Sequence, residues 1–203
     1  MTQHLQLTNL KISDNLVNTI SNINWQSLTP VFKVSPWFYF RHVLQHCYQH
    51  KIMPWHFLSN GSVGTLLTYK FPETIENAIK QELYASIYNM KEQPIIRLQV
   101  IYGGRHIAVH TDPTRSVSLV YPISNHNYAK TTFYKGPSTL GVINPADCVL
   151  DDYVIIDKHP VMFEVSKPHS VNYPAGTLTK QQPRISLSIK WQHSTFDQIA
   201  KHF

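Results

Sequence analysis

The second half of this sequence is a succession of short β-rich runs, and this restricts the fold more than any other feature. After Gln93 and Pro94, segments rich in β-branched and aromatic residues alternate with turn residues. Eight such segments follow one another with no helical pattern between them, which favours an antiparallel sandwich or jelly roll. We expect strands at Ile95–Tyr102, His106–Thr111, Ser116–Ile123, Thr131–Tyr134, Tyr153–Ile156, Val161–Val165, His169–Tyr173 and Arg184–Trp191.

Helical patterns flank this β-rich region. In Pro72–Glu92, apolar residues recur every three or four positions and acidic residues stand near the start, as in an amphipathic helix that covers a sheet. A shorter helix is expected at Asn15–Ile23, capped by Ser13 or Asp14, and a last one at Thr195–His202. The expected fold class is therefore mostly β with flanking helices (α+β).

The length and composition suit one folded domain. Hydrophobic residues make up 42% of the 203 residues and charged residues 15%, which is too apolar for a disordered chain. We expect a single domain at 1–203, with an N-terminal helical or lid-like support region at 1–94, a β core at 95–192 and a C-terminal tail at 193–203.

The cysteines and the apolar segments indicate a cytoplasmic protein. Cys47 and Cys148 are far apart and form no CxxC pair, and the first residues lack the charged and apolar regions of a signal peptide. No apolar stretch approaches the roughly 18 residues that span a bilayer. We therefore expect a soluble, cytoplasmic chain with free thiols and no membrane partner.

The segment from Leu16 to Pro72 is unusual because it contains no Asp or Glu, while basic, histidine and aromatic residues are frequent. With a net charge of +6 for the chain, an acidic partner is conceivable. No run of five Lys and Arg occurs, however, so the sequence lacks the dense basic patch of a dedicated nucleic-acid binder. The segment is either a substrate-recognition element or a layer that packs on the sheets.

Three histidines in this segment form a rival to any metal site elsewhere. His42, His46 and His50 are spaced by four residues, so they share one face if the segment is helical. No nearby carboxylate completes a ligand set, which favours packing or a place at a substrate entrance.

A His-x-Asp triplet in the β-rich half combines an imidazole with a carboxylate. His110 and Asp112 are two residues apart, so in an extended chain they point to the same side. Because such a triplet arises easily by chance, its meaning depends on the residues of the later strands. His169 begins a later expected strand, and Arg184 begins the last one, fifteen residues further on.

A jelly roll brings distant strands together at one open end. There, His169 would complete a face of two histidines and one carboxylate, which leaves three positions on a metal ion free. These positions suit a bidentate 2-oxo acid and O2. By the same alternation, His106 has the parity of His110 and is expected at the rim of the pocket or in a structural role.

The ordered pattern resembles that of the 2-oxoglutarate and iron(II)-dependent oxygenase superfamily, especially its prolyl-hydroxylase-like members. The matching residues are His110-Thr-Asp112, then His169, then Arg184-Ile-Ser186, within about residues 95–191. The resemblance implies a double-stranded β-helix (jelly roll, cupin-like) core. It further implies that His110, Asp112 and His169 bind Fe(II), and that 2-oxoglutarate and O2 serve as co-substrates.

The resemblance also implies which residues bind 2-oxoglutarate. Arg184 would hold the distal carboxylate, since its planar fork donates two charge-assisted hydrogen bonds. Ser186, two residues on, faces the same way and would add another. Tyr102 resembles a tyrosine that contacts the co-substrate in several members. The expected reaction is hydroxylation of a small molecule or a peptide side chain, with release of succinate and CO2.

Two alternative functions remain open from the sequence. One is a nucleic-acid base demethylase or hydroxylase of the same superfamily, motivated by the positive charge and the aromatic, basic stretch from Trp37 to Phe57. The other is a non-catalytic cupin-like binding protein. Metal-binding cupins usually carry a His-x-His pair, so His110-Thr-Asp112 disfavours this second alternative. The prime substrate and the oligomeric state cannot be predicted.

Overall fold

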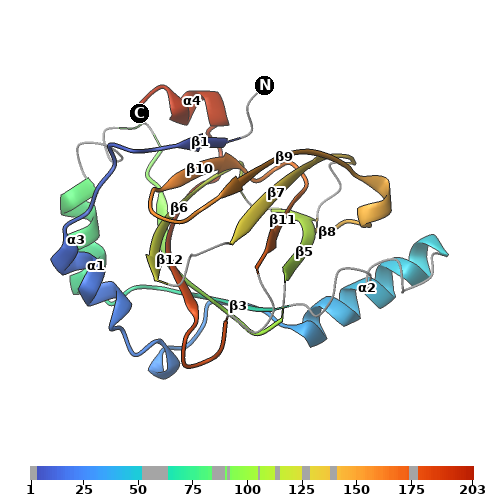
Figure 1. The fold of residues 1–203 in the computed structure, drawn as a ribbon, viewed down its shortest axis with the longest axis horizontal. Helices are drawn as coiled ribbons and strands as arrows, with labels where there is room; N and C mark the ends of the chain where they lie inside the picture. The colour runs from blue at the N-terminus through green and yellow to red at the C-terminus, as the bar shows by residue number, and fades with distance from the viewer. Residues whose placement is uncertain are drawn as a thin grey trace.

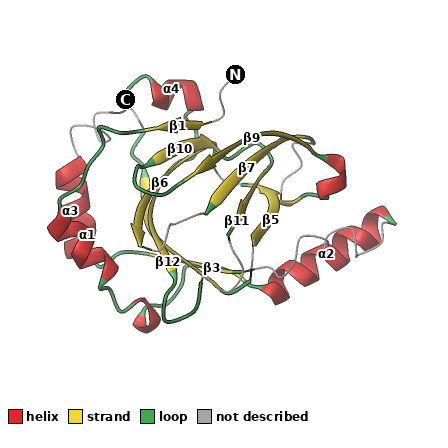
Figure 2. Cartoon of the chain, in the orientation of Figure 1, coloured by secondary structure: helices red, strands yellow, loops and turns green. Residues whose placement is uncertain are grey.

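The protein consists mainly of two antiparallel β-sheets with a few helices (Figures 1 and 2). The computed structural model describes residues 4–51, 64–83, 90, 92–104, 106–112, 115–124, 129–137, 141–173 and 178–203. The larger sheet has the order β1-β10-β6-β12-β4-β3-β2, and the smaller has the order β8-β5-β11-β7-β9. The strands are β1 His4–Gln6, β2 Phe32–Val34, β3 Thr65–Tyr69, β4 Ile95–Tyr102, β5 His106–Thr111, β6 Val117–Ser124, β7 Lys130–Lys135, β8 Gly141–Val142, β9 Val149–Ile155, β10 Val161–Glu164, β11 His169–Asn172 and β12 Arg184–Trp191.

From β4 onward the chain passes repeatedly between the two sheets, except that β7, β8 and β9 follow one another in the smaller sheet. Strands β4, β6, β10 and β12 belong to the larger sheet, while β5, β7, β8, β9 and β11 belong to the smaller. As a result, β12 lies between β4 and β6, and β5 pairs with β11, although about 60 residues separate β5 from β11. This alternation brings residues from distant parts of the chain to one place between the sheets.

Helices cover the outer face of the larger sheet. The helices are α1 Asp14–Ser21, α2 Pro36–His50, α3 Glu73–Leu83 and α4 Phe196–Ala200, with short 3-10 helices at Trp25–Ser27 and Pro145–Asp147. Figure 1 shows α1 and α3 side by side against this sheet, whereas α2 lies apart from them, with part of it near β8 of the smaller sheet. The Glu82 carboxylate of α3 accepts hydrogen bonds from the backbone N–H and the hydroxyl of Ser13, which caps α1. This links the two helices.

The main hydrophobic core lies between these helices and the larger sheet. Leu16 and Ile20 of α1 and Ile79 and Leu83 of α3 pack there with Leu187 of β12. Smaller apolar clusters fill the space between the two sheets on either side of a cavity. Burial of the larger sheet on both faces explains why all eight residues of β12 are buried.

The sequence-based expectations agree with most of these elements. The bounds of β4, β5 and β12 are as expected, and β6, β7, β9, β10 and β11 overlap their expected ranges. The helix expected at Asn15–Ile23 is α1, with Ser13 rather than Asp14 as its cap, and Thr195 caps α4. Of the helix expected at Pro72–Glu92, α3 covers Glu73–Leu83, while residues 84–89 and 91 lie outside the described residues.

Four strands were not expected. Strands β1, β2 and β3 come from the N-terminal region and join the larger sheet, and β8 joins the smaller. β1, β2 and β8 have two or three residues, which is too short for a periodic signal, and β3 is a five-residue apolar run without alternation. Cys47 and Cys148 are free, as expected. Within the described residues, no helix has the length and apolar character needed to cross a membrane.

Candidate metal centre

Two histidines and an aspartate meet between the sheets at the ends of β5 and β11. His110 lies in β5, Asp112 follows that strand by one residue, and His169 is the first residue of β11. His110 and His169 are direct partners across the two antiparallel strands, and their ring centroids are 4.3 Å apart. One possible ligand atom from each of the three residues lies within 4.8 Å of the others. The strand pairing therefore places the three groups that the sequence singled out in one cluster.

Backbone carbonyls orient both imidazole rings. The Nδ1 atom of His110 lies 2.7 Å from the carbonyl oxygen of Ala108, and Nδ1 of His169 lies 2.9 Å from that of Lys167. Because a carbonyl oxygen only accepts hydrogen bonds, Nδ1 carries the proton in each ring. The Nε2 atoms then keep their lone pairs, which is the arrangement that metal-binding histidines require.

The carboxylate of Asp112 is fixed by a neighbouring cation. Arg115 Nε donates to Asp112 Oδ2 at 2.5 Å, and the backbone N–H of Asp112 donates to the carbonyl of Val165 at 2.9 Å. Burial alone would raise the pKa of Asp112, but Arg115 and the two imidazoles outweigh this effect and hold it well below its usual range. The carboxylate is therefore charged at neutral pH.

His169 is buried and neutral. Burial lowers its pKa to about 4, an effect to which His110 adds and which Asp112 opposes. At neutral pH, the cluster thus offers neutral imidazole nitrogen and an ionised carboxylate oxygen. These are the protonation states in which the two residue types bind a metal ion.

A small cavity of about 60 Å³ contains this cluster and Arg184. Arg184 begins β12 on the opposite sheet and is only 3% exposed. Burial lowers its pKa to about 10, so the guanidinium remains charged at neutral pH. Apolar side chains such as Ile107 and Phe163 form much of the remaining wall. The cavity thus combines a three-ligand face with a buried cation.

Ser186 lies on the same face of β12 as Arg184, as expected. Both are buried, and Ser186 is paired with Gln99 of β4, a residue that lines the small cavity. In antiparallel strands, directly paired residues point to the same side of the sheet. Ser186 is therefore directed toward the space between the sheets.

Tyr102, in contrast, lies on the other face of the larger sheet. It packs against the main hydrophobic core, and its ring centroid is 5.8 Å from that of Trp25. Its neighbour Ile101 instead lines the small cavity, as alternation in a strand requires. The described structure thus does not bring Tyr102 to the cluster. The charge of Arg184 acts instead on Tyr173, where it opposes the rise in pKa that burial causes. The Tyr173 hydroxyl donates a hydrogen bond to the carbonyl of Gly103 at 2.8 Å.

His106 does not line the small cavity, so of its two expected positions the rim of the pocket is excluded and the structural role is left. An irregularity in the pairing of β5 with β11 lies between the partners of His110 and Ile107. As a result, Ile107 and His110 both line the small cavity, although they differ in parity. His106 is therefore directed away from the cavity, where it is 3% exposed and burial lowers its pKa.

The rival histidine site is only partly described. His42 lies on α2, as its spacing indicated, and its ring packs against Phe38 at 4.2 Å between centroids. The side chains of His46 and His50 lie outside the described residues, as do residues 52–63 of the acid-free segment. Within the described part of the chain, the cluster of His110, Asp112 and His169 is the group whose ligand atoms converge.

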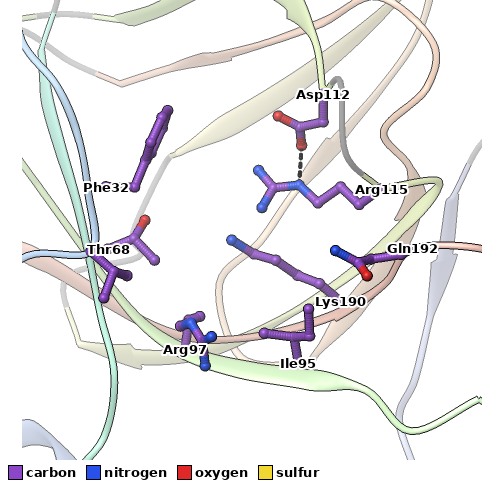
Figure 3. Close-up of a pocket in the computed structure, with 9 residues that line it drawn as sticks. Phe32, Thr68, Ile95, Arg97, Asp112, Arg115, Lys190 and Gln192 are labelled. Atoms are coloured by element: carbon purple, nitrogen blue, oxygen red, sulfur yellow. Dashed lines mark hydrogen bonds and ion pairs between the residues drawn. The ribbon is translucent and has the colours of Figure 1, made fainter.

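A second, larger cavity adjoins the cluster, and the sequence did not indicate it. Its volume is about 340 Å³, and Asp112 and Arg115 line both cavities. Arg97 of β4 and Lys190 of β12 also line it. Figure 3 shows the Lys190 ammonium and the Arg115 guanidinium directed into the larger cavity, with Phe32 on its far side. The signal that was available is the alternation of β12, which places Lys190 on the face of Arg184.

Comparisons with known proteins give only weak structural similarities. No protein-family model matches the sequence, and no curated protein matches it. Among solved structures, a Pseudomonas putida prolyl-4-hydroxylase is 15% identical over 88% of this chain and 99% of that one, with a TM-score of 0.34. An oxidoreductase of the 2OG-Fe(II) oxygenase family from Burkholderia pseudomallei is 9% identical over 65% of this chain and 69% of that one, with a TM-score of 0.39. Similarities this weak do not indicate a function for this chain.

Proposed function

We propose that the chain is an Fe(II)- and 2-oxoglutarate-dependent dioxygenase that hydroxylates a small molecule or a peptide side chain. The observation that carries the proposal is the meeting of His110, Asp112 and His169 in one cavity with the buried Arg184. Two histidines and one carboxylate with open positions are typical of non-haem Fe(II) oxygenases. The buried cation gives a dicarboxylate co-substrate a fixed point of attachment.

We further propose that the eight strands from β4 to β12, apart from β8, form a double-stranded β-helix. The support for this is the alternation of β4, β6, β10 and β12 in one sheet with β5, β7, β9 and β11 in the other. In this proposal, residues 95–192 form the catalytic core and residues 1–94 support it. The cluster then lies at the open end of the roll, where loops leave space for a substrate.

The donor set fits Fe(II). The three candidate ligand atoms are close enough to share one ion, and the tautomers set by Ala108 and Lys167 leave Nε2 available in both imidazoles. When bound, iron with 2-oxoglutarate and O2 supplies the chemistry that converts R–H to R–OH, with one oxygen atom entering succinate and CO2 as the further product. The role of the three residues is to hold the ion on one face and leave its other face free.

Arg184 and Ser186 would hold the distal carboxylate of 2-oxoglutarate. A planar guanidinium can donate two parallel hydrogen bonds to a carboxylate, and Ser186 on the same face can donate a third. The apolar wall of the cavity keeps water out, which strengthens these interactions. Tyr102 has no part in this proposal because it faces the hydrophobic core.

The direct test is the anaerobic addition of 2-oxoglutarate to the Fe(II)-loaded protein. A weak visible charge-transfer band should appear, and aerobic incubation should then release succinate slowly even without a prime substrate. His110→Ala should remove the band, whereas His202→Ala, at an exposed position, should leave it unchanged. A spectrum that 2-oxoglutarate does not alter in the wild-type protein would refute the proposal.

A nucleic-acid base oxygenase is the second candidate. Trp37 and Tyr48 on α2 are 74% and 89% exposed, and such rings can stack on unpaired bases. Succinate release that methylated single-stranded oligonucleotides stimulate, and that small molecules do not, would favour it. A protein that binds 2-oxoglutarate without ever releasing succinate would instead be a non-catalytic cupin-like binder.

A further inference from the structure

The larger cavity beside the cluster has an excess of positive charge. Arg97, Arg115 and Lys190 line it, and among the described residues Asp112 is the one carboxylate in its wall. That carboxylate already accepts a hydrogen bond from Arg115. Two of the three cations therefore face the cavity without an acidic counterpart in the described part of the wall.

Lys190 is the residue that makes this cavity unusual. It is 7% exposed, and none of the ion pairs found among the described residues includes it. Burial and the nearby Arg115 and Arg97 lower its pKa to about 7, against the opposing effect of Asp112. A buried ammonium without a partner costs free energy, and an anionic ligand in the cavity would offset that cost.

The two cavities lie at opposite ends of one row of side chains. Arg184 and Lys190 both point inward from β12, and six residues of strand separate them by about 20 Å. Asp112 lines both cavities, so the cluster lies between them. A dicarboxylate held by Arg184 therefore leaves Lys190 free to serve a different molecule.

The remaining wall of the larger cavity combines apolar side chains with the polar Thr68 and Gln192. Val31, Phe32 and Ile95 contribute to it, and its volume of about 340 Å³ is that of a small-molecule site. We propose that this cavity takes the prime substrate, a small molecule whose carboxylate or phosphate group binds Lys190 and Arg97 and whose apolar part packs on Phe32. This assignment rests on the proposed oxygenase function, since it supplies the substrate class for that reaction.

Binding to the metal-free protein tests the cavity separately from the reaction. Calorimetric titration with benzoate and with inorganic phosphate is expected to show that the wild type binds at least one of them. Lys190→Met should weaken that binding about tenfold or more, because a charge-assisted hydrogen bond is lost. Lys190→Arg should retain most of it, and Lys201→Met, at an exposed position, should match the wild type.

Other variants locate the anion. Arg97→Met should also weaken binding, whereas Arg184→Met should not, because Arg184 lines the small cavity. Thermal melts would verify folding, and methionine should be tolerated at position 190 because it removes a buried charge while keeping the volume. If neither anion binds the wild type, or if Arg184→Met alone abolishes binding, the assignment is overturned.

A second arm uses turnover with matched pairs of candidate substrates. Small apolar acids and phosphate esters should stimulate succinate formation more than the corresponding amides and alcohols, and Lys190→Met should remove that preference. Stimulation by an oligonucleotide but by none of these molecules would overturn the small-molecule assignment. If no succinate forms at all, the oxygenase function fails, while the titration still reports on the anion site.

Discussion

The two faces of β12 differ sharply in character. The face toward the helices carries Leu187, Ile189 and Trp191, which pack in the main core. The face toward the smaller sheet carries Arg184, Ser186, Ser188 and Lys190, all buried as well. One strand thus separates an apolar core from a face that buries polar groups at a cost in free energy, and the proposed function gives those polar groups a role.

The largest effect is expected from the apolar face. Leu187→Ala should destabilise the protein by about 2–5 kcal/mol, because it opens a cavity in a fully buried part of the core. Denaturant unfolding would measure this, with Ser188→Ala as the adjacent control. Ser188 is equally buried, and its hydroxyl has no hydrogen-bond partner among the described residues, so its loss should change stability little. If both variants lost a similar free energy of unfolding, the proposed difference between the two faces would be wrong.

Substitutions on the inner face of β12 should instead change ligand binding. Arg184→Met should weaken 2-oxoglutarate binding by about 1.5–3 kcal/mol, through the loss of charge-assisted hydrogen bonds. Titration of the anaerobic Fe(II) protein, followed by its visible band, gives this affinity. Iron affinity should stay near the wild-type value because Arg184 binds no metal in the proposed site. Equal loss of both affinities would mean that Arg184 has a structural role.

Lys190 should make the stability of the metal-free protein depend on pH. Its pKa is about 7 in the folded protein, because of burial and the arginines, and is near the usual 10.5 after unfolding. Between these values the unfolded chain binds more protons, so stability should rise with pH by up to about 1.4 kcal/mol per pH unit. Unfolding curves from pH 7 to pH 9 should show this rise in the wild type. Lys190→Met should lack this component, and identical slopes would contradict it.

The smallest effect is expected at Ser186. Ser186→Ala should weaken 2-oxoglutarate binding by about 0.5–1.5 kcal/mol, the contribution of one hydrogen bond. Ser188→Ala is again the matched control, since it lies two residues further along the same face. An affinity that falls equally in both variants would show that Ser186 makes no specific contact with the co-substrate.

The sequence predicted the core strands well because their patterns are local. β12 alternates strictly, and β4 and β5 end at turn residues, so their bounds could be read from spacing. Strands β1 and β2 are three residues long and are held by pairing with β10 and β3, which no local pattern encodes. The N-terminal contribution to the larger sheet was therefore missed.

The candidate metal site was predictable because it depends on parity and on the order of residues. The two-residue spacing alone predicted that His110 and Asp112 share one side of a strand. His169 and Arg184 were identified by the order in which they follow along the chain. Lys190 and Arg97 were missed because their meeting depends on the pairing of β12 with β4 and on the cavity beside it. Alternation in β12 places Lys190 on the face of Arg184, but no local pattern indicates that Arg97 of β4 lines the same cavity.

The irregular pairing of β5 with β11 also changes which side chains of β5 face the interior. It interrupts the two-residue alternation of side chains, so that Ile107 and His110 both face the small cavity although they are three residues apart. Side-chain alternation at the apolar end of β5 is therefore out of step with that at the end that carries the candidate ligand His110. Deleting one residue between them would leave a two-residue spacing, so that Ile107 and His110 would face the same side by ordinary alternation, without the irregularity.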